Sequence, residues 1–358
     1  MRRQGKDQDS FRLAVNMDLV TDANEHCRPF YNDVRWSSGL ARTVLLLPCV
    51  LPVRLTGVHG RDEDTPIRTL RILHRTRYAY DRPVSFGEHR LMIRPRDGHD
   101  MRILESSLTV SPRANVHWTF DTFGNSVALL SFHEAADELV IESELLLRRY
   151  GLDEPLTRIE RYAGTFPVHY DVDEFIDLGP YLVSDQPQDQ DVLAAWVAQV
   201  LPHPNGSSLE VLGALGTAVH GAFRYARREA EGVQTPAETI GLGTGTCRDF
   251  ALLFMDAARH LGFAARFVTG YLHDEGAGNE SGEDMTGGGA THAWADIFVP
   301  GAGWVEFDPT NHIIASRNLI RVATTRTPAQ ALPVSGTFEH EGGSLLGLQV
   351  AVRVIEVA

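Results

Sequence analysis

Apolar residues recur at helical spacing after a glycine-rich stretch in the second half of the chain. In "GLGTGTCRDFALLFMDAARHLGFAARFVTGYL", residues 241–272, six of them fall at i, i+3, i+4, i+7, i+8 and i+11: Phe250, Leu253, Phe254, Ala257, Ala258 and Leu261. This spacing predicts an amphipathic helix with one buried face. The helix should begin near Thr246 or Cys247, because the preceding glycines cannot propagate it, and Gly262 suits the position just after its end.

Two further helices are predicted upstream from the same kind of pattern. In "DVLAAWVAQVL" the apolar stripe consists of Val192, Leu193, Trp196, Val197 and Val200. In residues 207–225 it consists of Leu209, Leu212, Leu215, Val219 and Phe223. Ser207 with Glu210 matches the capping-box pattern at the start of this second segment. His220 lies near the edge of its stripe, which favours a structural role for that histidine.

The first half of the chain shows a different pattern, with short β-branched and aromatic runs in approximate alternation. The runs are "RTLRILHRTRYAY", "PVSFGEHRLMIRPR", "RILESSLTVSP", "VHWTFDTFGNSVALLSF" and "ELVIESELLLRRY", separated by "DRP", "RDGHD", "SPRAN" and "FGN". Strands broken regularly by turn residues predict an antiparallel β domain over residues 67–150. Asp121 and Asn125 of "DTFGN" are interpreted as formers of a tight hairpin turn, not as catalytic residues.

Two strands joined by a tight turn are predicted downstream of the best-defined helix. "AARFVTGYL" has the composition of a strand, and "THAWADIFVP-GAG-WVEFDPT" that of a β-hairpin. A three-residue loop Pro300–Ala302 would pair Val299 with Gly303. Asp308 is then a diagonal neighbour of His292, within reach of a side-chain contact. A two-residue loop would put the two side chains on opposite faces of the sheet.

Composition limits the kinds of partner. Of the 358 residues, 43% are apolar and 22% charged, as in an ordinary globular protein, and the net charge of −14 disfavours nucleic acid as a partner. No stretch reaches the ~18–20 apolar residues of a membrane helix. Val44–Val53 is short, contains two prolines and lies too far from Met1 for a signal peptide. We therefore expect a soluble protein without a membrane partner, of unknown oligomeric state.

The cysteines point to a compartment and to a nucleophile. Cys27, Cys49 and Cys247 are too few for a disulfide framework and lack zinc-ribbon spacing, so a reducing cytoplasm fits best. Cys27 and Cys49 could pair, which leaves Cys247 free in any compartment. At a helix N-terminus the macrodipole and the unpaired N–H groups favour the thiolate, the form that attacks carbonyls. A lone cysteine, however, is more often a small buried hydrophobe.

The predicted hairpin supplies the groups that a nucleophilic cysteine needs. Residues two apart on a strand share a face, so His292, Trp294 and Asp296 point one way. If the turn aligns the two strands, Asp308 reaches the ring of His292. A thiol on a helix, with a base and an orienting carboxylate on a sheet, is the thiol version of the catalytic triad. Cys247 would attack, His292 would take and return the proton, and Asp308 would fix the tautomer.

These segments together resemble the transglutaminase-like core. "GTCRDFALLFMDAARHLGFAARFVTGYL", "THAWADIFVPGAGWVEFDPTN" and the upstream "YARREAEGVQTPAETI" carry the family pattern G-x-C-x-D-x-A, R-x-V-x-G-Y, H-x-W and G-W-x-x-x-D-P-T, in order. "ILHRTRYAYDRPVSFGEHRLMIRPR…DTFGN" resembles the N-terminal region of bacterial transglutaminase-like proteins. The resemblance covers roughly residues 68–320. It implies amide acyl chemistry, with the family's catalytic residues at Cys247, His292 and Asp308.

The patterns and the resemblance predict an α+β fold. An N-terminal antiparallel β domain precedes a papain-like, transglutaminase-like core of helices packed on an antiparallel sheet. Along the chain we expect an irregular extension (residues 1–66), the β domain (67–150), a connector with extended pieces (151–186) and the catalytic core (187–325). A tail (326–358) follows and ends in the strand "LLGLQVAVRVIEV". The extension has no counterpart that we recognise.

The neighbours of the predicted triad receive weaker assignments. The backbone N–H of Cys247 should be one oxyanion donor, and the second could come from Gln234 or Tyr225, between which the sequence does not choose. Asp249, in the first helical turn, is favourable to the helix dipole whatever its function and is expected to be structural. Arg248 is expected to be a salt-bridge partner.

Three other hypotheses compete. A dinucleotide site would use Gly241, Gly243 and Gly245, but the third glycine comes one residue early and no good strand precedes it. A metal hydrolase would gather four side chains round zinc, those of His312, His292, Cys247 and Asp308. A non-catalytic scaffold would keep the fold for binding, although the three triad residues are all present.

The function that the sequence favours is a cytoplasmic thiol enzyme acting on peptide or isopeptide amides through a thioester. Hydrolysis is preferred to transfer to an amine, because "DEGAGNESGEDMTGGGA", residues 274–290, should be a wet loop poorly suited to excluding water. The acidic part, Asp274–Asp284, could attract calcium, but loops of this composition are usually only solvated. No metal or cofactor is expected, and the partner is a protein or peptide substrate.

Overall fold

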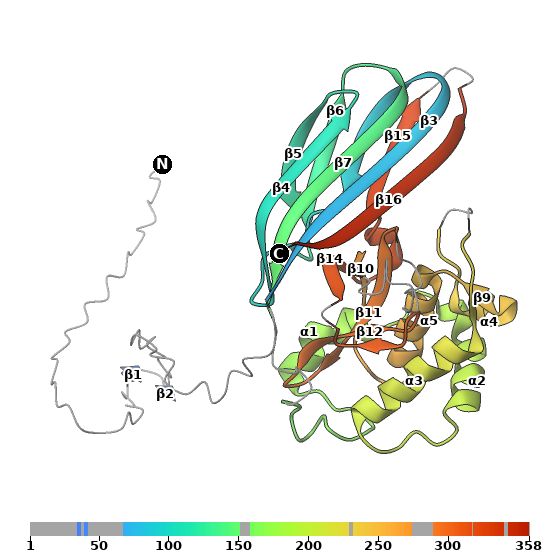
Figure 1. The fold of residues 1–358 in the computed structure, drawn as a ribbon. Coiled ribbons are helices and arrows are strands. Elements are labelled where there is room, and N and C mark those ends of the chain that lie inside the picture. The colour runs from blue at the N-terminus through green and yellow to red at the C-terminus, as the bar shows by residue number, and fades with distance from the viewer. Residues whose placement is uncertain are drawn as a thin grey trace, which may run out of the picture. The chain divides into compact units, whose positions relative to one another are not determined.

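The computed structural model describes most of the chain after residue 66 (Figure 1). The described ranges are 67–150, 158–228, 232–273, 289–316, 318–339 and 343–357, with the backbone of the paired strands β1 (Val34–Trp36) and β2 (Gly39–Ala41). Residues 1–61 and 62–358 are separate units. The predictions for Cys27, Cys49 and the acidic loop 274–284 lie outside the described residues. Within the described ranges no helix is both long and apolar enough to cross a membrane.

Residues 67–150 form antiparallel β structure, the kind of fold that was predicted for them. Its strands within that range are β3 (Arg68–Leu91), β4 (Met101–Ser111), β5 (Ala114–Phe120), β6 (Ser126–Phe132) and β7 (Ala136–Arg149), and two strands of the predicted tail complete it. They are hydrogen-bonded in the order β4-β7-β3-β6-β5, and every neighbouring pair is antiparallel. The turns predicted at "RDGHD", "SPRAN" and "FGN" fall between these strands.

The turn predicted at "DRP" is wrong. β3 runs through Asp81–Pro83 as one strand of 24 residues, with a register shift between Ala79 and Val84. Before the shift β3 pairs with β7, and near its end it pairs with β6. Because proline cannot donate to a strand ladder, it is tolerated at such an irregularity. The strand therefore continues through Asp81–Pro83 with a shifted register and does not reverse direction.

The C-terminal tail returns to the β domain. β15 (Val334–Glu339) and β16 (Leu345–Val357) both pair antiparallel with β3, so the orange and red strands lie beside the blue one in Figure 1. The strand predicted from "LLGLQVAVRVIEV" is confirmed, with the same bounds. Its place in the β domain is a finding that the sequence pattern did not predict.

The predicted core is an antiparallel sheet of five strands covered by helices. The strand order is β13 (Ile313–Ile314), β12 (Gly303–Asp308), β11 (His292–Val299), β10 (Ala265–Leu272) and β14 (Leu319–Thr325). The three predicted helices are α2 (Gln190–Val200), α3 (Ser208–Ala222) and α5 (Cys247–His260). Most residues of their apolar stripes form one cluster with alternate residues of β11, Ala293, Ala295, Ile297 and Val299. Val192, predicted as part of the stripe of α2, is instead exposed.

The connector predicted for 151–186 contains a helix that periodicity did not reveal. α1 spans Val172–Leu182 and begins with a capping box between Asp171 and Glu174. Of its side chains only Leu178 is buried, so the helix has no buried apolar stripe for a pattern to detect. The D-x-x-E spacing was the signal that could have found it.

Short elements lead into α5. They are η2 (Pro187–Asp189), β8 (Arg224–Tyr225), α4 (Pro236–Leu242) and β9 (Thr244–Gly245), and η3 (Pro328–Gln330) follows β14. β8 and β9 pair in parallel, with Tyr225 opposite Gly245. Tyr225 is thereby fixed next to the residues that start α5.

The β domain and the core share buried apolar surface. One cluster joins residues of β3, β6 and β7 with residues of β10 and β14: Leu70, Ile72, Val127, Leu145 and Leu147 with Tyr271, Ile320, Val322 and Ala323. Burial of this kind contributes on the order of 25 cal/mol per Å² of apolar surface. The two parts of residues 62–358 are therefore packed against each other and not merely tethered.

Candidate active site

Cys247 is the first residue of α5, as predicted. The Thr246 hydroxyl accepts from the Asp249 N–H, and the Asp249 carboxylate accepts from the Thr246 N–H at 2.8 Å, which forms a complete capping box. A Cβ at Gly245 would lie 2.9 Å from the Phe250 ring, so the approach to the helix requires glycine there. The Cys247 side chain is thus held at the positive end of the helix dipole, and the residue is only 7% exposed.

Asp249 has the structural role that was predicted for it. Its carboxylate is fully buried and accepts from the backbone N–H of Gln234 at 2.7 Å and from the Arg228 guanidinium at 3.1 Å. With the bonds to Thr246, these contacts satisfy both oxygens. The carboxylate is therefore committed to holding the start of α5.

The hairpin β11–β12 has the predicted register. Val299 pairs with Gly303 across a three-residue loop, and Gly301 and Gly303 both have positive φ, 87° and 77°. A Cβ at Gly301 would come within 2.1 Å of the Arg158 carbonyl, which only glycine avoids. His292 Nε2 and Asp308 Oδ2 are 2.8 Å apart, and both side chains are completely buried.

The pKa values of this pair are shifted away from each other. Burial opposes the charge on His292, but the charge and hydrogen bond of Asp308, with a smaller contribution from Cys247, outweigh it and raise the pKa of the imidazole to about 10. Burial also opposes the charge on Asp308, yet its contacts with His292 keep the pKa of that carboxyl below its ordinary value. Both shifts favour the form of the pair in which the imidazole is protonated and the carboxyl is ionised.

Asn311 is a site residue that the sequence reasoning missed. Its Nδ2 donates to Asp308 Oδ2 at 2.8 Å and lies 3.5 Å from His292 Nε2, while the Thr310 N–H donates to Asp308 Oδ1 at 2.9 Å. Asp308 is therefore oriented by the turn that follows it. The available signal was the spacing "DPTN", in which an Asx residue can bond to backbone N–H groups two and three positions on.

Cys247 lies within electrostatic reach of the other side of the imidazole. Contact with Cys247 helps to raise the pKa of His292, but the buried Nδ1 of His292 makes no hydrogen bond of ordinary geometry. The thiol and the imidazole ring are therefore neighbours. Hydrogen bonds between catalytic groups are commonly long until substrate binds. The structure thus brings the three predicted residues together.

Tyr225, one of the two predicted oxyanion donors, interacts electrostatically with Cys247. Burial, and after it the charge of Cys247, raise the pKa of the half-buried phenol. Gln234, the other predicted donor, is buried; its Oε1 accepts from the Thr239 hydroxyl at 3.3 Å, and its backbone N–H is bound to Asp249. The Tyr225 hydroxyl is therefore a candidate for the second donor.

Among the residues that the structure describes, Arg248 has no carboxylate partner for the predicted salt bridge. Its guanidinium donates to the carbonyls of Pro328 at 2.7 Å and Ala331 at 3.5 Å, and lies 5.0 Å from the centroid of the Phe267 ring. Burial lowers the pKa of Arg248, whereas Cys247 and then Asp249 act against that shift. Arg248 is thus a cation next to the thiol that is anchored on backbone carbonyls.

The competing sites find no support in the geometry. His312 Nε2 is bonded to the Thr217 hydroxyl at 2.8 Å and its ring stacks on His220, so His312 does not join His292. In the part of the chain that the structure describes, no group of three or more His, Cys, Asp or Glu is arranged to hold a metal. Of the glycines of the supposed dinucleotide loop, Gly241 lies within α4, Gly243 ends that helix with φ 67°, and Gly245 lies in β9, so the loop follows a helix and not a strand.

A cysteine at a helix N-terminus, facing a histidine–aspartate pair on an antiparallel sheet, defines a papain-like class of thiol proteins. Comparison with known families agrees with this class. The transglutaminase-like superfamily matches residues 196–309, and the bacterial transglutaminase-like N-terminal region matches residues 70–148. The chain belongs to the transglutaminase-like superfamily and carries the bacterial N-terminal region before the core.

Relatives share this organisation over most of their length. An uncharacterized protein of Mycobacterium leprae is 25% identical over 299 residues, which cover 81% of this chain and 99% of the relative. One of Mycobacterium tuberculosis is 28% identical over 303 residues, covering 80% and 93%. The crystal structure of a candidate cysteine protease from Cytophaga hutchinsonii matches with a TM-score of 0.63 at 18% identity, covering 82% of this chain and 93% of that chain. This last similarity shows the fold.

Proposed function

We propose that this protein is a thiol enzyme that acts on peptide or isopeptide amide bonds through a thioester on Cys247. The observation that carries the proposal is the buried pair of His292 and Asp308, joined at 2.8 Å, with Cys247 beside the ring at the start of α5. A nucleophile, a base and an orienting carboxylate in this arrangement are the parts that covalent acyl transfer requires.

The proposed reaction begins from the thiolate of Cys247 and the imidazolium of His292. Sγ attacks the amide carbon, and the oxyanion that forms accepts from the backbone N–H of Cys247 and the hydroxyl of Tyr225. As the C–N bond breaks, Nδ1 of His292 gives its proton to the leaving amine, and a thioester remains. Neutral His292 then takes a proton from water, the hydroxide attacks the thioester, and the acid leaves with regeneration of the thiolate.

Asp308 keeps the ring in place through both steps. It binds Nε2, so that Nδ1 is the nitrogen that carries the mobile proton, and its charge stabilises the imidazolium. Asn311 and the Thr310 N–H, which donate to the carboxylate, restrict its rotation. The orientation of His292 thus rests on the turn after β12 as well as on the strand.

We propose water as the acceptor that resolves the thioester. The support is the composition of residues 274–290, rich in glycine and acidic side chains, which suits a wet entrance more than a water-excluding amine channel. A protein-glutamine acyltransferase is the competing function, because the same acidic residues would attract a lysine amine. The predicted cytoplasmic location, and the predicted lack of nucleic-acid and membrane partners, stay predictions.

The test combines labelling with product analysis. An electrophile that mimics a peptide amide should modify Cys247, and a peptide library should reveal substrates; Cys247→Ala should give neither label nor product. With a substrate amide and excess primary amine, we expect mainly free acid. Mainly amine-linked product would assign the acyltransferase, and an unlabelled, inactive wild-type protein would leave only the binding scaffold.

A further inference from the structure

The segment between the core sheet and the C-terminal strands is bound by both ends of α5. We call residues 324–331, which run from the end of β14 through η3, the bridge segment. Arg248, next to Cys247, donates to its Pro328 and Ala331 carbonyls, and Arg259, in the last turn of α5, donates to its Arg326 carbonyl at 2.9 Å. A shift of the bridge segment would therefore pull on both ends of α5.

The β domain holds the same segment from the other side through Asn125. The Asn125 side chain pairs with the backbone of Thr324: Nδ2 donates to the carbonyl at 2.7 Å, and Oδ1 accepts from the N–H at 2.9 Å. β14 is an edge strand of the core sheet. The Asn125 amide therefore binds backbone groups of β14 on the side where a further strand could pair. Asn125 is 1% exposed. A hairpin turn is thus docked by two buried hydrogen bonds.

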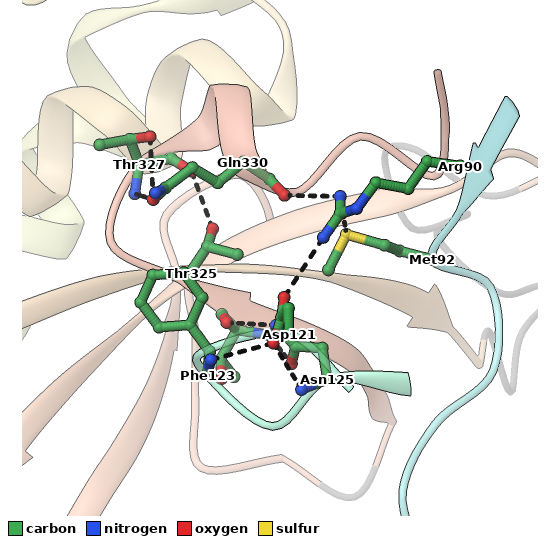
Figure 2. Close-up of polar contacts among 9 residues, drawn as sticks. Arg90, Met92, Asp121, Phe123, Asn125, Thr325, Thr327 and Gln330 are labelled. Carbon is green, nitrogen blue, oxygen red and sulfur yellow. Dashed lines mark hydrogen bonds and ion pairs between the residues drawn. The ribbon is translucent and has the colours of Figure 1, made fainter. Parts of the chain in front are cut away.

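Arg90 provides the second link, as Figure 2 shows. Its guanidinium donates to the Gln330 carbonyl of η3 and to the Asp121 carboxylate, each at 3.3 Å. Asp121 in turn accepts from the N–H groups of Phe123 and Asn125, and from the Asn125 amide at 2.9 Å. Turn, arginine and bridge segment therefore form one connected network.

We propose that Asn125 and Arg90 are positioning residues for Cys247, acting through the bridge segment and Arg248. The inference rests on the proposed function, which it extends by making the β domain a working part of the thiol site. The bonds run without a break from Asn125 and Arg90 to the bridge segment, and from Pro328 and Ala331 to Arg248. Displacements of about 1 Å cost catalytic sites on the order of 100-fold in rate.

Charge adds to geometry in this network. Arg248 and Cys247 interact electrostatically, and a cation held close to the sulfur favours the thiolate. The two carbonyls that anchor Arg248 belong to the segment that the β domain holds. Loosening the turn should therefore move the guanidinium relative to Sγ and lower the reactivity of the thiol, even though Asn125 touches neither Cys247 nor His292.

The test measures alkylation of Cys247 by iodoacetamide as a function of pH, which needs no substrate. Asn125→Asp keeps the shape but removes both donated bonds and places a carboxylate against Asp121 and the Thr324 carbonyl. Arg90→Lys removes the forked contact. Asn115→Asp is the matched control, since it adds the same charge to the same hairpin at an exposed position, where the Asn115 amide bonds to the His133 ring.

We expect Asn125→Asp to slow alkylation about tenfold and Arg90→Lys about threefold, with the pH profile displaced to higher pH, and Asn115→Asp to match the wild type. Circular dichroism should show all variants folded. In an Arg248→Lys background the effect of Asn125→Asp should shrink, because the two substitutions break the same path.

The outcomes separate this inference from the proposed function. If wild-type Cys247 reacts like an ordinary free thiol, the proposed function fails. If the wild type reacts fast and the folded Asn125→Asp and Arg90→Lys proteins react equally fast, or if Asn115→Asp slows as much, the positioning role is wrong and the proposed function stands. Should Asn125→Asp lose its secondary structure, Arg90→Lys and its combination with Arg248→Lys decide the question.

Discussion

Two histidines of this molecule are almost equally buried and yet are driven to opposite charge states. His292, 1% exposed, contacts Asp308, and its pKa is raised to about 10. His74, on β3 of the β domain, is 4% exposed, and its two ring nitrogens are hydrogen-bonded to the neutral hydroxyls of Tyr271 and Thr76. Burial lowers its pKa to about 4.

The comparison shows that the partner decides what burial does to a histidine. Burial disfavours the imidazolium at both positions, and only a carboxylate at hydrogen-bond distance reverses the balance. His74 therefore joins the β domain to Tyr271 of the core as a neutral ring. His292 is instead poised to exchange a proton with its surroundings. Of these two buried histidines, His292 is the candidate base, because it has Asp308 as its partner.

The largest expected effect comes from making His292 resemble His74. Asp308→Asn removes the charge that holds the imidazolium but keeps the size of the side chain. We expect kcat to fall by about 10⁴-fold, as when the orienting carboxylate of a triad is lost. Steady-state kinetics on the substrate found by labelling would measure the loss, and a rate within threefold of the wild type would remove Asp308 from the mechanism.

Loss of the proposed oxyanion donor should have a smaller effect. Tyr225→Phe keeps the ring in place between β8 and α5 but removes its hydroxyl. We expect kcat to fall about 100-fold with little change in the alkylation rate of Cys247, because the hydroxyl acts on the oxyanion and not on the free thiol. Gln234→Ala, the alternative donor, should leave kcat near the wild-type value once folding is verified. The opposite result would exchange the two assignments.

Asn311→Ala should have a smaller effect on kcat than Asp308→Asn or Tyr225→Phe. The substitution leaves the His292–Asp308 contact but removes one hydrogen bond that orients the carboxylate. A fall of about tenfold in kcat, with KM unchanged, is expected for a lost hydrogen bond to a charged group. Titration of His292 followed by NMR provides the check: its pKa should drop only slightly, far less than in Asp308→Asn.

The two histidines should also mark opposite ends of the pH–stability curve. For His74 the folded-state pKa is lowered to about 4 from the ordinary 6.5, so its contribution is complete above pH 6.5 and is lost as pH falls toward 4. For His292 the folded-state pKa is raised from 6.5 to about 10, so its contribution is complete below pH 6.5 and is lost as pH rises through 10.

His74→Gln should therefore flatten the acid limb of that curve and leave the alkaline limb unchanged. The part removed is on the order of 3 kcal/mol at pH 4, because one pKa unit corresponds to about 1.4 kcal/mol. Urea unfolding at a series of pH values would measure both limbs. An acid limb that is equally steep in the variant would mean that other groups, and not His74, cause the loss of stability there.

The sequence patterns predicted the site better than the contacts that support it. Helical spacing, glycine positions and the parity of the hairpin were enough to place Cys247, His292 and Asp308, because each depends on local geometry. Asn311 was missed although it is only three residues from Asp308, since an Asn after a strand is most often a turn former. Asn125 was interpreted as a turn former; it also docks on β14, which depends on a contact 199 residues away in the chain.

The antiparallel strands of the β domain were predicted, but the way in which they are connected and paired was not. Its alternating runs indicated antiparallel strands, but "DRP" reads as a turn although β3 continues through it. The pairing of β16 with β3 joins the end of the described chain to its beginning, and nothing local in "LLGLQVAVRVIEV" specifies that partner. Long-range pairing is decided by the packing of the whole fold, which a pattern along the chain does not contain.

The central claim is that Cys247 and His292 act as a thiolate–imidazolium pair. Its most direct test is the rate of Cys247 alkylation at pH 6 in three proteins. The account predicts fast alkylation in the wild type and in His74→Gln, and a rate lower by about 100-fold in His292→Ala, because only His292 supplies the balancing charge. Equal rates in the wild type and in His292→Ala would contradict the account and make Cys247 an ordinary buried residue.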